Sequence, residues 1–257
     1  MRHRMVVTAA LAGSLAVLVP VSQGEAAELV VWTSQGSILN VREVTGAFAS
    51  ASGHKITVVA VGGSGLARKL ASGEQVDVMV VGEEMDGLAE KGMVVAGTVK
   101  PFLTANLGAA VRTGTPKPDI STVEAYKAAL LAAKSIGYSF GCSGMNIAKG
   151  IEELGLTEQL KAKTVRTGSQ AGGGPVSEHL VKGDFEFGIQ QINIMAGQPG
   201  IDYVGPLPGA MNKPCTTNVG LMAGSKQQEA ARALMQFMLS PEAVPLLRKT
   251  HAEPAKS

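Results

Sequence analysis

Four short segments rich in Ser and Gly contain the residues best suited to binding chemistry in this 257-residue sequence. Each one follows a predicted strand and precedes a predicted helix; they cover residues 33–36, 62–65, 141–144 and 168–174. Gly lets the backbone approach a ligand, a Ser hydroxyl can donate, and a helix start adds unpaired N–H groups and a positive dipole end. Together they could hold a small anion without a buried Lys or Arg. The competing interpretation is that each Ser only caps its helix.

Other residues leave several kinds of chemistry open. Cys142 and Cys215 are the two cysteines, and they could form a disulfide, remain as buried thiols, or provide a catalytic Cys142. Arg166 precedes the last Gly-rich segment, where it could pair with a carboxylate of a ligand. Trp32 either packs in the core or forms a wall of the cleft. Lys69 is expected on a solvated helix face.

Composition and charge exclude several classes of protein. The chain has 23 Lys and Arg against 21 Asp and Glu, so it lacks the basic excess that grips a phosphate backbone. Four scattered His and two Cys show no zinc-ligand spacing. We therefore expect no nucleic-acid partner, no metal site and no cofactor. A hydrophobic content of 45% indicates a folded globular chain.

The first 26 residues have the organisation of a secretory signal peptide. Arg2 and Arg4 precede an apolar stretch over residues 5–21, and small residues occupy the −3 and −1 positions of a cut after Ala26. Export to the periplasm as a soluble protein is the prediction. An exported chain can form disulfides.

The elements that position the Ser- and Gly-rich segments alternate along the rest of the chain. Runs rich in Val and Ile alternate with helical patterns, which indicates βαβ units in open sheets. Strands are expected over residues 29–33, 55–61, 76–81, 105–112, 135–140, 163–166, 185–191, 202–205 and 215–222. Helices are expected over residues 37–52, 64–72, 84–91, 121–134, 144–154, 175–182, 226–239 and 241–249. Continuous apolar runs of this kind favour parallel strands covered on both faces.

Two such α/β blocks predict a fold of two lobes with a hinged cleft between them. We expect lobe 1 over residues 27–104, lobe 2 over 105–214, and a return to lobe 1 with closing helices over 215–257. Ligands bind to such sheets outside the carboxyl ends of the strands, and closure about a hinge is the expected motion.

The order of these segments resembles the type II periplasmic solute-binding proteins of ABC importers, most closely the molybdate-binding protein family. The resemblance covers residues 29–253, and residues 62–81 (GGSGLARKLASGEQVDVMVV) are similar to that family's Ser-rich turn, helix and strand. Residues 188–191 and 231–243 support it. It implies the type II two-lobed fold, a small anionic ligand and a membrane permease as partner.

Carried over by position, the resemblance also implies a set of ligand contacts. These are Ser34, Gly63, Ser64, Ser143, Gly144, Gly172, Gly173, Gln190 and Gln191. Gln191 stands where the family usually has Tyr, and the residues around Ser34 and Ser64 also depart from the family's doublets. These departures leave another oxyanion or a small organic acid open as the ligand.

The leading hypothesis is therefore an exported, monomeric binding protein that captures a small anion and delivers it to an ABC importer. An enzyme on the same scaffold, an isomerase or hydrolase of small organic acids, is the alternative. A third hypothesis is a binding module that works without a transporter.

Overall fold

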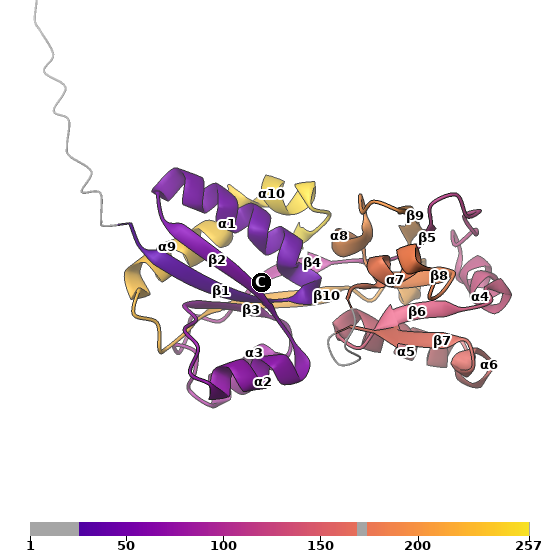
Figure 1. The fold of residues 1–257 in the computed structure, drawn as a ribbon, viewed down its shortest axis with the longest axis horizontal. Coiled ribbons are helices and arrows are strands. Elements are labelled where there is room, and N and C mark those ends of the chain that lie inside the picture. Colours follow the sequence, from indigo (N-terminus) through magenta and orange to yellow (C-terminus); the bar gives the residue numbers. More distant parts are fainter. Residues whose placement is uncertain (1–25, 169–173, 257) are drawn as a thin grey trace, which may run out of the picture.

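A computed structural model describes residues 26–168 and 174–256 of the chain. The predicted signal peptide lies outside this part except for its last residue, Ala26. The described residues form two α/β lobes, each built on its own sheet (Figure 1). The lobe with the six-stranded sheet is called lobe 1, and the lobe with the five-stranded sheet is called lobe 2.

The sheet of lobe 1 has the strand order β2-β1-β3-β10-β4-β11. Its strands are β1 (Glu28–Ser34), β2 (Lys55–Val61), β3 (Val78–Val81), β4 (Lys100–Ala105), β10 (Cys215–Leu221) and β11 (Glu253–Pro254). The helices of this lobe are the 3-10 turn η1 (Gln35–Ser37), α1 (Ile38–Ser52), α2 (Gly63–Ala71), α3 (Glu84–Glu90), α9 (Gln228–Met238) and α10 (Ala243–Lys249).

Strand β3 shows why apolar runs form this sheet. All four of its residues are buried, because α1, α9 and α10 cover one face of the sheet and α2 and α3 cover the other (Figure 1). Side chains alternate along a strand, so Val78 and Val80 join the first core cluster while Met79 and Val81 join the second. Trp32 packs in the second cluster with 1% of its surface exposed, so it is a core residue.

The sheet of lobe 2 has the strand order β7-β6-β8-β5-β9. Its strands are β5 (Leu107–Arg112), β6 (Ile136–Ser139), β7 (Thr164–Thr167), β8 (Phe187–Gln191) and β9 (Ile201–Pro206). Its helices are α4 (Val123–Ala132), α5 (Cys142–Glu153), α6 (Thr157–Lys161), α7 (Val176–Lys182), α8 (Ile192–Met195) and the 3-10 turn η3 (Gly209–Met211).

The chain passes between the lobes at two places, and there the predicted elements need correction. The single strand expected over residues 105–112 is two strands, because β4 ends at Ala105 in lobe 1 and β5 begins at Leu107 in lobe 2. The return runs from β9 to β10. Strands β5 and β10 begin at these crossings, and both run antiparallel to their neighbours in the sheet. Strands β1 to β3 in lobe 1 and β6 to β8 in lobe 2 pair in parallel, as expected.

A buried amide network joins the lobes away from the crossing strands. The side-chain Nδ2 of Asn193 in α8 donates to the backbone oxygen of Gly36, 2.7 Å away, and to Oδ1 of Asn40 in α1. Asn40 in turn donates to Thr250 after α10. Asn40 and Asn193 are at most 1% exposed, so these contacts fix lobe 2 against the helical layer of lobe 1.

Among residues 26–168 and 174–256, the helices are all too short or too polar to span a lipid bilayer.

Candidate functional site

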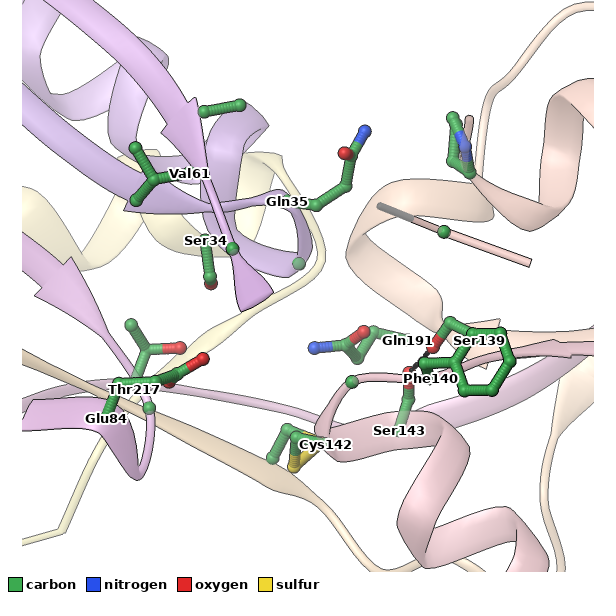
Figure 2. Close-up of a pocket in the computed structure, with 18 of the residues that line it drawn as sticks. Ser34, Gln35, Val61, Glu84, Ser139, Phe140, Cys142, Ser143, Gln191 and Thr217 are labelled. Carbon is green, nitrogen blue, oxygen red and sulfur yellow. Dashed lines mark hydrogen bonds between the residues drawn. A yellow bond between two sulfur atoms is a disulfide. The ribbon is translucent and has the colours of Figure 1, made fainter. Parts of the chain in front are cut away.

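A cleft of about 610 Å³ lies between the two lobes, lined by residues of both (Figure 2). The ends of β1, β2 and β3 reach it from lobe 1, and the starts of α5 and α7 and the end of β8 reach it from lobe 2. Each of the four Ser- and Gly-rich segments contributes to the lining. Their lining residues are Ser34, Gln35, Gly36, Gly62, Gly65, Gly141, Cys142, Ser143, Gly168 and Gly174.

The wall from lobe 1 presents hydroxyl and backbone groups. Oγ of Ser34 lies 2.8 Å from Oγ of Ser37, which lies 2.9 Å from Oγ1 of Thr33, so a chain of hydroxyls orients Ser34. Gly63 and Ser64 form the start of α2, where no described side chain caps the helix. The N–H of Gly65 donates to the backbone oxygen of Gly62, so the N–H groups before it in this first turn are the ones available to an anion. The side chain of Ser64 lies outside the described part of the structure.

The wall from lobe 2 is built around the start of α5. Oγ of Ser143 lies 3.0 Å from Oγ of Ser139, and both residues line the cleft. No described side chain caps α5 either. Gly144 is buried behind this wall, so close to Ser139 that a Cβ at position 144 would overlap the Ser139 carbonyl oxygen. Gly144 thus permits the close approach of α5 to β6, although it does not itself line the cleft.

Arg166 does not face the cleft, contrary to the interpretation that it pairs with a ligand carboxylate. Its Nε and Nη2 donate to the backbone oxygen of Ser139 at 3.1 and 2.9 Å. Its guanidinium lies over the rings of Tyr138 and Phe140, 4.6 and 4.4 Å from their centroids. Arg166 therefore holds the β6–α5 turn in place, and the sequence could not reveal this because the carbonyl it binds is 27 residues away.

The two neighbouring glutamines have different environments. The Oε1 of Gln190 accepts from the backbone N–H of Val176 at 3.0 Å, so this side chain caps α7. Gln191 lies against Gly36 of lobe 1, where a side chain would collide with its amide. Figure 2 shows the Gln191 amide pointing across the cleft toward lobe 1.

Cys142 and Cys215 form a disulfide, with their Cα atoms 6.1 Å apart. Of the three interpretations left open by the sequence, the disulfide is confirmed, and the interpretation of Cys142 as a catalytic thiol is wrong for this oxidised chain. The bridge ties the first residue of α5 in lobe 2 to the first residue of β10. Both cysteines line the cleft.

Charged residues of the cleft were largely missed by the sequence analysis. Lys69, expected on a solvated face, lines the cleft and pairs with Glu74, whose pKa is held below its usual value by the hydrogen bond from Lys69. Glu83 and Glu84 line it too, and Thr217 does so from β10. Glu83 and Glu84 follow β3 after Gly82, at the same sheet edge as the Ser- and Gly-rich segments. Their position after a predicted strand was the feature of the sequence that could have identified them as cleft residues.

Two predicted contacts, Gly172 and Gly173, lie outside the described residues. In the part of the chain that the structure describes, no group of three or more His, Cys, Asp or Glu side chains is placed to hold a metal ion.

The two-lobed fold and its interlobe cleft define the class of type II periplasmic binding proteins. The periplasmic molybdate-binding protein of Azotobacter vinelandii has this fold, with a TM-score of 0.70 and 16% identity over 89% of this chain and 100% of that chain. The sulfate-binding protein SubI of Mycobacterium tuberculosis has it too, with a TM-score of 0.67 and 19% identity over 90% of this chain and 88% of that chain.

Sequence comparison places the chain in a family. The profile of the bacterial extracellular solute-binding proteins matches residues 12–252, and the chain belongs to that family. One relative is named as an enzyme and not as a binding protein. An aconitate isomerase of a Pseudomonas species is 30% identical over 233 residues, which are 88% of this chain and 87% of that protein.

Proposed function

We propose that the protein is exported, binds a small organic anion of the carboxylate class in its interlobe cleft, and delivers it as a monomer to an ABC permease. The observation that carries the proposal is the cleft lining. Hydroxyl groups of Ser34, Ser139 and Ser143 and two uncapped helix starts face it from both lobes. Such preorganised dipoles favour an anion.

The cleft leaves room for an organic ligand larger than a lone tetrahedral oxyanion. Sites for small organic molecules typically measure roughly 300–1,000 Å³, and this cleft measures about 610 Å³. A tetrahedral oxyanion needs only a few times the roughly 30 Å³ of a water molecule. The disulfide supports export, because disulfides persist in oxidising compartments.

A thermal-shift panel on the mature, ligand-stripped protein tests the proposal. Molybdate, tungstate, sulfate and phosphate are compared with small mono-, di- and tricarboxylates. A ligand at 100 times its Kd adds about 2.7 kcal/mol of stability, so at least one carboxylate is expected to raise the Tm by several degrees. A rise with molybdate and tungstate alone would contradict the carboxylate assignment, and silence across the panel would contradict binding of a small anion.

A second candidate function is isomerisation of an unsaturated tricarboxylic acid. The observation that favours it is the 30% identity, over nearly the full length of both chains, to a protein named aconitate isomerase. Glu83 and Glu84 give the cleft carboxylates able to move a proton. Removing a proton from the methylene carbon of aconitate and returning one to the other end of the allylic system would shift the double bond without a net change in atoms.

Proton NMR of cis-aconitate and trans-aconitate incubated with the protein tests this candidate. The two isomers have distinct vinyl signals, and catalysis is expected to bring them to the same ratio from either side. Ratios that stay at their starting values, with aconitate bound, would leave binding as the function and rule out the isomerase.

A further inference from the structure

Two buried polar side chains face the cleft without a partner among the described residues. Gln191 is 8% exposed and Thr217 is 5% exposed. Both line the cleft, and no side-chain hydrogen bond involves either of them in the described part of the chain. Their polar atoms are not among the fully buried, unpaired side-chain atoms of the described residues, so they are open to the cleft and available to a polar group of a ligand. Figure 2 shows Gln191 pointing toward the wall that carries Thr217 and Glu84.

The position of Glu84 places a carboxylate beside Thr217. Asn218 of β10 pairs with Val81 of β3 in an antiparallel register, which brings the next residues, Thr217 and Gly82, opposite one another. Oε2 of Glu84 lies 3.7 Å from where a Cβ on Gly82 would stand. None of the ion pairs among the described residues includes Glu84.

The chemistry of these three groups selects what they can bind. An ionised carboxylate only accepts hydrogen bonds, an amide donates and accepts, and a Thr hydroxyl does either. A ligand carboxylate here would meet the like charge of Glu84 and have no hydrogen to donate to it. An alcohol hydroxyl fits, because it can donate to Glu84 while accepting from Gln191 or Thr217.

We infer that Glu84, Gln191 and Thr217 form a subsite for the hydroxyl group of a hydroxycarboxylic acid. The carboxylates of the same ligand then lie against the Ser-lined walls and helix starts. This inference rests on the proposed binding of a carboxylate, and it names the subclass of carboxylate that is preferred.

Ligand pairs that differ by one hydroxyl test the inference directly. Isothermal titration calorimetry on the mature protein compares citrate with tricarballylate, malate with succinate, and lactate with propionate. We expect the hydroxy acid of the pair that binds to have at least a tenfold lower Kd than its partner. Equal or tighter binding of the acid without the hydroxyl would overturn the subsite and leave carboxylate binding intact. No binding by any of the six acids would overturn both.

Variants then assign the preference to the named residues. Glu84→Gln and Thr217→Val are expected to reduce the preference for the hydroxy acid at least fivefold, with little loss for the acid lacking the hydroxyl. Glu90→Gln, at the other end of the same helix and outside the cleft, is the matched control and keeps the preference. Equal losses for both acids of a pair, or an unchanged preference in both cleft variants, would overturn the assignment.

Discussion

Cys142 and Cys215 are joined by a disulfide at the point where the chain returns from lobe 2 to lobe 1. Cys142 is the first residue of α5, and Cys215 is the first residue of β10. Asn146 of α5 strengthens the same connection by donating to the backbone oxygen of Lys213 at 3.0 Å. The returning strand is therefore bound to the helix whose start faces the cleft, and any pivot in this crossing must lie beyond Cys215.

Removing this disulfide should destabilise the protein. The bridge spans 73 residues, and its loss frees a long loop in the unfolded chain. For the variant Cys142→Ser with Cys215→Ser we expect a free energy of unfolding lower by about 2–4 kcal/mol. Urea unfolding of the oxidised protein and of the variant measures the difference. Equal midpoints would contradict a stabilising bridge.

Gly144→Ala should disturb the start of α5. The added carbon would overlap the Ser139 backbone oxygen, and backbone cannot move aside as a flexible side chain can. We expect the free energy of unfolding to fall by about 1–3 kcal/mol, and ligand binding to weaken. Gly141→Ala is the matched control for stability, because nothing lies within 4 Å of its added carbon. Identical melting temperatures for the two variants would contradict a close contact between Gly144 and the Ser139 backbone oxygen.

Ser34→Ala and Ser143→Ala should weaken binding of whichever ligand gives the largest thermal shift. Each removes a hydroxyl at the cleft, one on each lobe, and leaves a ligand oxygen without its donor. We expect losses of about 1–3 kcal/mol, which is roughly 5- to 150-fold in Kd. Titration calorimetry measures them, with Ser50→Ala on the exposed side of α1 as control. Unchanged Kd values in both variants would exclude these hydroxyls as ligand contacts.

Asn40 and Asn193 should show coupling in a double-mutant cycle. Each alanine variant alone removes the hydrogen bond between Asn193 and Asn40 and leaves a buried polar partner. We expect each single variant to lose about 1–3 kcal/mol and the double variant to lose less than the sum, with a coupling of roughly 0.5–3 kcal/mol. Additive losses in chemical unfolding would mean that the two side chains act independently.

Tyr126 should make the protein sensitive to alkali. The side chain is 2% exposed, and burial raises its pKa far above the ordinary value, with a smaller contribution from Tyr138. In the unfolded chain the Tyr126 hydroxyl ionises near pH 10, whereas in the folded chain it stays neutral. The free energy of unfolding is therefore unaffected by this group below pH 10 and falls above pH 10 by about 1.4 kcal/mol per pH unit. Tyr126→Phe should lose less stability than the wild type between pH 9 and pH 11 in urea unfolding. Equal losses of stability in Tyr126→Phe and in the wild type over this pH range would contradict a raised pKa of Tyr126.

Local patterns in the sequence were sufficient for much of the fold. The alternation of Val-rich runs with helical segments depends on residues close in the chain, and it located β1, β2, β3, α1 and α9 to within a few residues. The same patterns located the Ser- and Gly-rich segments at the ends of strands. Since the ends of parallel strands meet at one sheet edge, the convergence of these segments on one cleft could also be foreseen.

Tertiary structure alone decided which polar groups are free to bind. Arg166 is taken by the Ser139 carbonyl and Gln190 by the Val176 N–H, while Gln191 and Thr217 face the cleft unpaired among the described residues. Neighbouring residues of the same type thus differ in role, because hydrogen bonds are formed across long separations in the chain. The pairing of Cys142 with Cys215 and the antiparallel entry of β10 likewise follow from how the two lobes pack, which no local pattern encodes.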